Sequence, residues 1–318
     1  MGDLEALDIV IAAPSDRTRR NTWGDFHFAR GLQEAMREQR IGGRVLCRDQ
    51  LTGLRVGRSH ALLVLRGKFR PSADWLLSSG YSLRLLWVIS WPLDLSQDEL
   101  ALYDLIFVAS IQDLPRIARL SGKPTLFLPQ ATAFQSFQPA PASDGKLLFI
   151  GNTRGLHRPI VQAFAREDLP LSVIGQGWHE QGLRPEAGSI ANDQLPERYR
   201  RALAVLNDHH GAMRDYGYMN NRIYDALACG IPVISDMAPD CPDDLMPAVI
   251  LHRPGRDDPA ETLEAVTALR RQSTLLHSVA RRVRRKHSFS ARAHTLLHAL
   301  AELRINTASS APTEKAGG

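Results

Sequence analysis

Residues 220–236 read NNRIYDALACGIPVISD and carry the clearest local structure signals in the chain. They predict a helix from about Asn220 to Gly230, because glycine often ends a helix in a left-handed conformation. Pro232 prevents the helix from continuing, and the apolar residues after it predict a buried strand. A helix that leads directly into a buried strand is the repeating unit of a parallel α/β sheet.

The same alternation of apolar runs and helical spacing extends along the rest of the chain. Several runs are continuously apolar, which is typical of strands buried on both faces of a parallel sheet. In the first part of the chain we expect strands at Leu7–Ala13, Arg44–Cys47, Ala61–Leu65, Arg84–Ser90, Leu105–Ala109 and Thr125–Leu128. In the second part we expect them at Lys146–Ile150, Leu171–Ile174, Leu203–Asn207, Ile231–Ser235 and Ala248–Leu251.

A stretch rich in proline and small residues, PQATAFQSFQPAPASDG at 129–145, separates the two sets of strands and indicates an interdomain linker. We therefore predict an α/β fold with two doubly wound, Rossmann-like domains, for which 318 residues suffice at about 150 residues per domain. The expected division is an N-terminal domain at 1–130, a linker at 131–145, a C-terminal domain at 146–287, a last helix at 288–305 and a disordered tail at 306–318.

Composition narrows the classes of function. No apolar stretch reaches the about 18 residues of a membrane-spanning helix, and the first residues, MGDLEALDIVIAAP, lack the basic start of a signal peptide. The three cysteines form no CxxC pair and have no histidines at metal-ligand spacing, so we expect no metal site and a reducing, cytoplasmic location. The net charge of +5 favours an anionic partner, and no nucleic-acid-binding motif accompanies it, so we expect no nucleic acid.

The densest basic run lies near the end of the chain and consists of Arg281, Arg282, Arg284, Arg285 and Lys286. Two interpretations remain open. The run is either the solvated face of a helix or a contact with anionic lipid, which would give a peripheral association with the inner face of a membrane.

Ligands of open parallel sheets bind beyond the carboxyl ends of the strands, so the loops after strands are the candidate sites. The first is GNTRGLHR at 151–158, where Gly151 and Asn152 would let the backbone approach a phosphate and Arg154 and Arg158 could bind a diphosphate. The alternative is an ordinary turn with surface arginines. The loop matches neither GxGxxG nor a Walker A motif, so NAD binding and ATP hydrolysis are not expected.

The second candidate loop, NDHHGAMRD at 207–215, is densely polar and follows a predicted strand. We expect His209 and Arg214 to contribute to ligand binding. The adjacent histidines favour a metal only weakly, because neighbouring residues on an extended segment face opposite sides.

The third candidate is the start of the helix at Asn220, where helix N-termini favour anions. Asn220, Asn221 and Arg222 are therefore expected to contact an anionic ligand. Asp225 lies one turn further on and could accept hydrogen bonds from sugar or ribose hydroxyls, or form a salt bridge with Arg222.

The segment NNRIYDALACGIPVISD resembles the donor-site segment of GT-B glycosyltransferases, and is most similar to the CgeB-like group (spore maturation protein, glycosyl transferases group 1). The residues at 207–215, Gly151-Asn152 and HSFSARA at 287–293 also fit this group. The resemblance implies a GT-B fold, a nucleotide-sugar donor held by the C-terminal domain, no required metal, and a last helix that crosses back to the N-terminal domain. The broader retaining group carries two glutamates here, and this chain has Gly217 and Asp225 at those positions.

In GT-B enzymes the loop after the first strand faces the cleft, and here it reads PSDRTRRNTWGDFH at 14–27. Gly24 would permit close approach of the backbone, and Asp25 or His27 could act as a general base on an acceptor hydroxyl. The alternative makes Asp25 a helix N-cap and His27 a surface residue. Trp91, after a later strand, either lines the acceptor pocket or packs in the core.

We therefore expect a metal-independent, hexosyltransferase-type enzyme that moves a sugar from a nucleoside-diphosphate sugar to a hydroxyl acceptor on a glycan, lipid or protein. No cofactor is expected besides the donor, because arginines and helix N-termini can stabilise the leaving diphosphate. Two alternatives remain. One is a catalytically inactive GT-B-like protein that binds a carbohydrate or a partner, and the other is a nucleotide-sugar epimerase of the same fold.

Overall fold

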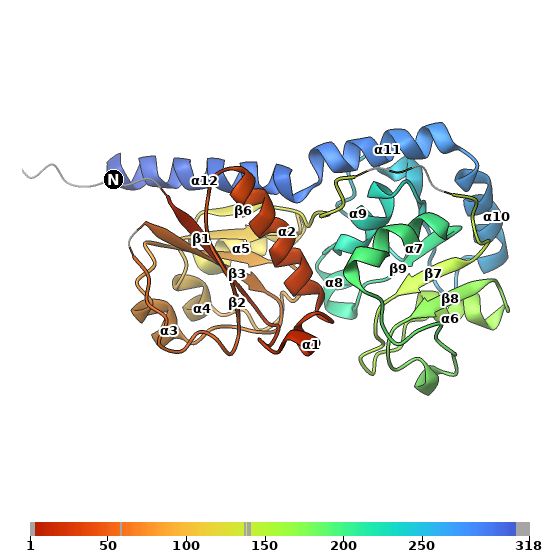
Figure 1. Ribbon diagram of the computed structural model, residues 1–318, viewed down its shortest axis with the longest axis horizontal. Coiled ribbons are helices and arrows are strands. Elements are labelled where there is room, and N and C mark those ends of the chain that lie inside the picture. The colour runs from red at the N-terminus through yellow and green to blue at the C-terminus, as the bar shows by residue number, and fades with distance from the viewer. Residues whose placement is uncertain (1–3, 58, 137, 139–140, 310–318) are drawn as a thin grey trace, which may run out of the picture.

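The computed structural model describes residues 4–57, 59–136, 138 and 141–309, and it contains two parallel β-sheets. Figure 1 shows the two lobes side by side, each with its own sheet and helices. The first sheet has six strands in the order β2-β1-β3-β4-β5-β6, and the second has five in the order β11-β10-β9-β7-β8. The expected fold of two doubly wound, Rossmann-like domains is confirmed.

The strands lie close to their expected bounds. The first sheet contains β1 (Ala6–Ile11), β2 (Val45–Cys47), β3 (His60–Arg66), β4 (Leu83–Val88), β5 (Leu105–Val108) and β6 (Thr125–Phe127). The second contains β7 (Leu147–Ile150), β8 (Leu171–Ile174), β9 (Ala204–Asn207), β10 (Val233–Ser235) and β11 (Val249–Leu251). In the first sheet β2 lies on one side of β1 and β3 to β6 lie on the other. In the second sheet β8 lies on one side of β7 and β9 to β11 lie on the other. Each sheet therefore has a topological switch point where a ligand can bind.

Helices cover both faces of each sheet. The first lobe contains α1 (Arg17–Arg20), α2 (Gly24–Glu38), α3 (Ala73–Ser78), α4 (Gln97–Ala101) and α5 (Leu114–Ser121). The second contains α6 (Pro159–Arg166), α7 (Leu195–Arg201), α8 (Gly211–Asp215), α9 (Asn221–Ala228), α10 (Pro259–Arg270) and α11 (Ser273–Lys286), with short 3₁₀ turns at His179–Gln181, Asn192–Gln194 and Met246–Ala248. Among these described residues no helix is long and apolar enough to span a bilayer.

The apolar strands follow from this two-sided packing. In β1, Ile9 belongs to the core beneath α2, whereas the next residue, Val10, belongs to the core on the opposite face of the sheet. Successive residues of a strand point to opposite faces, so a strand covered on both sides must be apolar throughout. Both residues are completely buried.

The last helix, α12 (Phe289–Ser309), leaves the second lobe and packs on α2 of the first. The rings of Phe289 and Phe28 meet edge to face, 4.6 Å apart at their centroids. A Cβ on Gly31 of α2 would lie 2.7 Å from the Phe289 ring, so a glycine is needed for this close approach. The helix is described as far as Ser309, four residues beyond the expected bound of 305. The rest of the expected disordered tail, residues 310–318, lies outside the described residues.

Two chain segments cross between the lobes next to each other. The backbone N–H of Thr132 donates to the carbonyl of His287 at 3.0 Å, and the N–H of Phe289 donates to the carbonyl of Thr132 at 3.1 Å. Arg292 is buried beside them and donates its guanidinium hydrogens to backbone carbonyls of Pro129, Gln130 and Lys286. These bonds hold both crossings in one ordered joint.

Candidate functional site

A cleft of about 300 Å³ lies between the two lobes. Its position follows from the topology, since Ile150 ends β7 and Asp208 follows β9, the two strands at the switch point of the second sheet. The lining residues are Gly24, His27, Phe28, Ala133, Phe134, Ile150, Gly151, Asn152, Arg154, Arg158, Asn192, Leu195, Tyr199, Asp208, His210, Met213, Asn220, Asn221, Arg222, Asp225 and Phe289.

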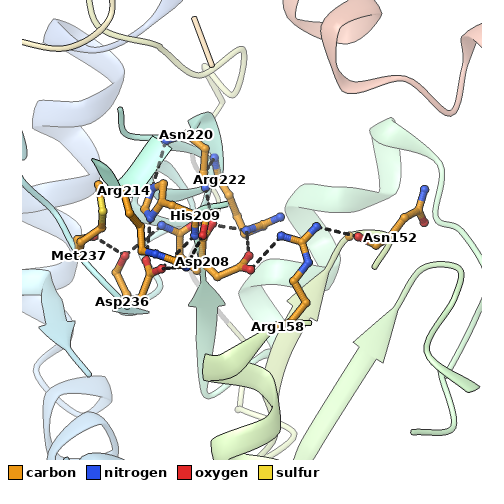
Figure 2. A network of polar contacts seen from close by, with 12 residues as sticks. Asn152, Arg158, Asp208, His209, Arg214, Asn220, Arg222, Asp236 and Met237 are labelled. Carbon is orange, nitrogen blue, oxygen red and sulfur yellow. Dashed lines mark hydrogen bonds and ion pairs between the residues drawn. The ribbon is translucent and has the colours of Figure 1, made fainter. Parts of the chain in front are cut away.

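One buried carboxylate organises two of the arginines in this cleft. Asp208 is 4% exposed, and its Oδ2 accepts a hydrogen bond from Nη1 of Arg158 at 2.8 Å. Its Oδ1 lies 3.5 Å from Nη1 of Arg222 in an ion pair. Figure 2 shows the two guanidinium groups meeting at this carboxylate. Because the side chains of both arginines are largely buried, these contacts fix their positions firmly.

Arg222 has two further contacts that hold its guanidinium in place. Nη1 donates to Oδ1 of Asn207 at 3.2 Å, and the guanidinium carbon lies 4.6 Å from the centroid of the Phe149 ring. Such cation–π contacts are favourable when the cation is partly desolvated. Arg222 is thus held by a carboxylate, an amide and an aromatic ring.

The loop at 151–158 contributes Arg158 and a third arginine, Arg154. Arg158 donates through Nη2 to the carbonyl of Asn152 at 2.8 Å, which fixes the loop around it. Arg154 has a positive φ of 53° and, within the part of the chain that the structure describes, no hydrogen bond or ion pair. Desolvation by the cleft walls lowers the pKa of Arg154, and the positive charges of Arg158 and Arg222 lower it further. All three arginines line the same cleft.

Gly151 has a different role from the one expected. Its N–H donates to the carbonyl of Ile174 at 2.8 Å, and its carbonyl accepts from the indole of Trp178 at 3.0 Å. The amide of Gly151 is therefore already bonded and is not free to bind a phosphate. A Cβ at Gly151 would lie 3.1 Å from Nη2 of Arg222, so the glycine makes room for that guanidinium.

The start of α9 faces the cleft. Asn220 is the N-cap, and its Oδ1 accepts from the backbone N–H of Arg222 at 3.1 Å. Its amide nitrogen donates to the carbonyl of Asp208 at 2.8 Å, which joins the helix to the turn after β9. Asn221 donates to Oδ2 of Asp225 at 3.0 Å. Asn220, Asn221 and Arg222 all line the cleft.

Asp225 sits where the cleft meets the joint between the lobes. Its Oδ1 accepts from the hydroxyl of Thr132 at 2.6 Å, and the residue is 7% exposed. Burial raises the pKa of this carboxyl to about 7, although hydrogen bonds from Thr132 and Asn221 oppose the rise. The salt bridge with Arg222 considered from the sequence is not among the ion pairs of the described residues.

His209 and Arg214, which were expected to contribute to ligand binding, are not among the residues that line the cleft. His209 is 1% exposed; its Nε2 accepts from the N–H of Asn220 at 3.4 Å, so Nδ1 carries the proton and donates to Asp236 at 2.6 Å. Arg214 donates to the carbonyl of His209 at 2.7 Å. Both residues support the turn before α9.

The two candidate bases in the first lobe are separated by the fold. His27 lines the cleft, and its Nε2 donates to the carbonyl of Asn21 at 2.8 Å, so in the neutral ring Nδ1 carries no proton. Asp25 is neither a lining residue nor the N-cap, which is Trp23. Its Oδ2 accepts from the N–H of Ala12 at 2.9 Å, and burial raises its pKa. Residues two apart on a helix point in different directions, so only His27 reaches the cleft.

His210 was not selected from the sequence but lines the cleft. It caps α8 by accepting from the N–H of Met213, and its ring lies 5.2 Å from that of Trp91 in the first lobe. Burial, together with the positive charge of Arg158, lowers the pKa of His210 to about 4, so the ring is neutral at physiological pH. Trp91 is not a lining residue; it packs between His210 and Lys68, whose Nζ lies 4.2 Å from the indole centroid.

Other missed lining residues come from segments without a strand-end signal. Asn192 and Leu195 lie at the 3₁₀ turn that leads into α7, and Tyr199 lies on α7 itself. Their spacing in the sequence is that of an ordinary amphipathic helix. Within the described ranges no group of three or more His, Cys, Asp and Glu side chains is placed to hold a metal ion.

The lobes also meet next to the cleft, at the segment after α8. The hydroxyl of Ser110 donates to the carbonyl of Tyr216 at 2.7 Å, and the hydroxyl of Tyr218 donates to Oδ2 of Asp113 at 2.8 Å. Tyr218 is completely buried and belongs to the core of the first lobe. The second lobe therefore inserts this segment into the first.

Gly217 lies inside this interlobe contact, with a positive φ of 73°. A Cβ there would lie 2.7 Å from Oε1 of Gln112 and 3.1 Å from the hydroxyl of Ser110. The positive φ and these close neighbours therefore favour a residue without a side chain at this position.

Comparisons with known proteins agree with this architecture. Residues 154–298 match a protein-family model described as "Glycosyl transferase-like", and no curated protein matches the sequence. A sucrose-phosphate synthase from Thermosynechococcus elongatus is similar in structure, with a TM-score of 0.64 and 13% identity over 95% of this chain and 100% of the other. An alpha-glucosyltransferase in complex with UDP has a TM-score of 0.62 and 10% identity, and the match covers 93% of this chain and 99% of the other. AviGT4, a glycosyltransferase involved in avilamycin A biosynthesis, has a TM-score of 0.60 and 13% identity, and the match covers 94% of this chain and 98% of the other. These structural similarities confirm the expected GT-B fold, and the family model matches the second lobe and the start of α12.

Proposed function

We propose that this GT-B protein transfers a sugar from a nucleoside-diphosphate sugar to a hydroxyl group of a glycan, lipid or protein. The observation that carries the proposal is the convergence of Arg154, Arg158 and Arg222 at the switch point of the second sheet. Asp208 balances two of these cations, so the site keeps an excess of positive charge. A diphosphate supplies the negative charge that such a site favours.

The chemistry follows from where charge develops. As the bond between the sugar and the diphosphate breaks, the sugar gains oxocarbenium character and negative charge accumulates on the leaving diphosphate. Guanidinium groups already held in position stabilise that charge without reorganising. We therefore propose that the arginines compensate the diphosphate without a metal ion.

His27 is the proposed general base. Its unprotonated Nδ1 can take the proton of the acceptor hydroxyl while the hydroxyl oxygen forms the new bond to the sugar. The proton moves to the imidazole and the bonding electron pair of the old linkage leaves with the diphosphate. Asp25 stays behind His27 and takes no part in this step.

Finer aspects of the sequence interpretation also belong to the proposal. These are membership of the CgeB-like group, transfer of a hexose and a cytoplasmic location. UDP is the first nucleotide to test, because the structurally similar alpha-glucosyltransferase is in complex with it.

The test is calorimetric titration of UDP, with GDP and ADP as parallel probes, into the wild-type protein and Arg222→Ala. We expect the substitution to weaken binding of the preferred nucleotide by about 1.5–3 kcal/mol, roughly 10- to 150-fold in Kd. Arg166→Ala is the matched control, because Arg166 is exposed at the end of α6 outside the cleft. Equal affinity in the wild-type protein and Arg222→Ala would overturn the placement of the diphosphate.

Product analysis with a labelled donor separates the two alternatives. A transferase gives labelled product only when an acceptor is present, whereas an epimerase converts the donor without one. A protein that binds nucleotide but gives neither product across a panel of donors and acceptors would be a binding protein.

A further inference from the structure

The second lobe has a basic hollow that is separate from the cleft. It measures about 220 Å³ and is lined by Ser278, Arg281, Arg282 and Arg285. All four residues lie on α11 at spacings of three and four, so they share one face of the helix. None of them lines the donor cleft.

The positive charge of this face is not balanced on its own helix. The sequence of α11, STLLHSVARRVRRK, contains no acidic residue. Within the described ranges, neither Arg281 nor Arg285 makes a hydrogen bond or an ion pair. Arg282 donates one hydrogen bond, to the carbonyl of Asp244 at 3.0 Å, and the carboxylate of Asp244 pairs with Lys286 at 3.4 Å.

The helix cannot turn these arginines inward. Leu276, Val279 and Val283 on the opposite face are buried in the core of the second lobe. Arg284 donates to the carbonyl of Ala228 at 2.7 Å, which adds a polar contact on that inner side. The packing therefore keeps three arginines on one surface face of the helix, where an anion would relieve the repulsion between their charges.

We propose that this hollow binds a phosphate group. Planar guanidinium forks match the geometry of phosphate oxygens and bind them through paired hydrogen bonds, and the hydroxyl of Ser278 can add one more. The phosphate can come from the headgroup of an anionic lipid, which would hold the protein at a membrane surface, or from a soluble molecule. In the cleft, the carboxylate of Asp208 pairs with Arg158 and Arg222. In contrast, α11 carries no carboxylate that would compete with a bound anion.

The experiment compares the wild-type protein with the double variant Arg281→Ala/Arg285→Ala. The control is Arg37→Ala/Arg119→Ala, which removes two exposed arginines from the first lobe and changes the net charge equally. One arm measures co-sedimentation with vesicles of phosphatidylglycerol in phosphatidylcholine against phosphatidylcholine alone. The other measures calorimetric titration of inorganic phosphate and pyrophosphate in the presence of saturating UDP, so that the cleft is occupied.

We expect the double variant to lose at least about tenfold in affinity in one arm, and the control to behave as the wild type. A loss confined to the vesicle arm assigns the site to lipid phosphate, and a loss confined to the soluble arm assigns it to a free phosphate. The proposal is overturned if the wild type binds neither probe, or if the control loses as much as the double variant. UDP binding by both variants, measured separately, reports on the proposed function independently.

Discussion

The two walls of the cleft differ in how firmly their polar groups are held. In the second lobe, Asp208, Arg158, Arg222 and Asn220 bind one another across three separate segments of the chain. In the first lobe the wall is formed by Gly24, Phe28 and His27. Among the described residues, the polar side-chain contact of this wall is one hydrogen bond from His27 to the carbonyl of Asn21. A network that is already formed before the ligand binds suits a part of the substrate that is chemically the same in every donor. We infer that the second lobe binds the diphosphate, which is that common part, and that the acceptor contacts the first lobe, whose wall has fewer polar contacts.

The largest expected effect on the transfer rate comes from the wall in the first lobe. His27→Ala is expected to lower the transfer rate by about 10²–10⁴-fold, the contribution of a positioned general base, and to leave the Kd for nucleotide unchanged. Steady-state rates and calorimetry on the same preparation measure both quantities. His294→Ala, at an exposed position of α12, is the control. If nucleotide affinity falls together with the rate, the division of labour between the walls is wrong.

In the networked wall, Asp208→Ala should lower the free energy of unfolding by about 3 kcal/mol. Removing this carboxylate leaves two largely buried guanidinium groups facing each other without a counter-ion. Urea denaturation measures the loss, and a nucleoside diphosphate should restore part of it by supplying negative charge. Asp193→Ala, an exposed carboxylate at a 3₁₀ turn, serves for comparison and should have little effect. A similar loss in both variants would contradict the central position of Asp208.

Where the walls touch, Gly217→Ala should destabilise the protein by about 1–2 kcal/mol from backbone conformation, with a further loss from the clash at Gln112. Gly182→Ala is the matched control, because Gly182 has nearly the same φ of 76° and open space at its Cβ position. The difference between the two variants in thermal unfolding isolates the interlobe contact. No difference would mean that the lobes separate easily at this point.

At the base of the cleft, Asp225→Asn should change the pH dependence of stability. The carboxyl has a pKa of about 7 when folded and about 4 when unfolded, so between these values the folded protein holds a proton that the unfolded chain has released. The free energy of unfolding of the wild type therefore falls as pH rises through this window. The variant should gain in melting temperature over the wild type from pH 5 to pH 8. A constant difference across that range would show that Asp225 does not titrate there.

Much of the second wall could be predicted because its signals are local. Gly151, Asn152, Arg154 and Arg158 follow a strand directly, and strand ends of a parallel sheet converge at one edge. The N-cap at Asn220 and the glycine after the helix define α9 within a few residues of sequence. In the wall from the first lobe, Gly24 and His27 were named because the loop after the first strand faces the cleft in GT-B enzymes. Phe28 had no such signal, because its neighbours in space come from the joint and from α12.

Side-chain direction is where prediction from sequence failed. His209 and His210 are adjacent, yet one is buried against Asp236 and the other lines the cleft. Asp25 and His27 are separated in the same way. The direction of each side chain depends on partners that lie 13 to 27 positions away, such as Ala12 for Asp25 and Asp236 for His209. No local pattern encodes those partners.

The sequence by itself determined the strands, the division into two α/β lobes and the arginines that gather at the strand ends, because apolar periodicity and chain order are local properties. Only the tertiary structure decided that Asp208 links Arg158 to Arg222, that the amide of Gly151 is already bonded, and that Gly217 is pressed against the other lobe. Each of these depends on distances between segments far apart in the chain, and those distances are set by how the two sheets pack and by the joint between the lobes.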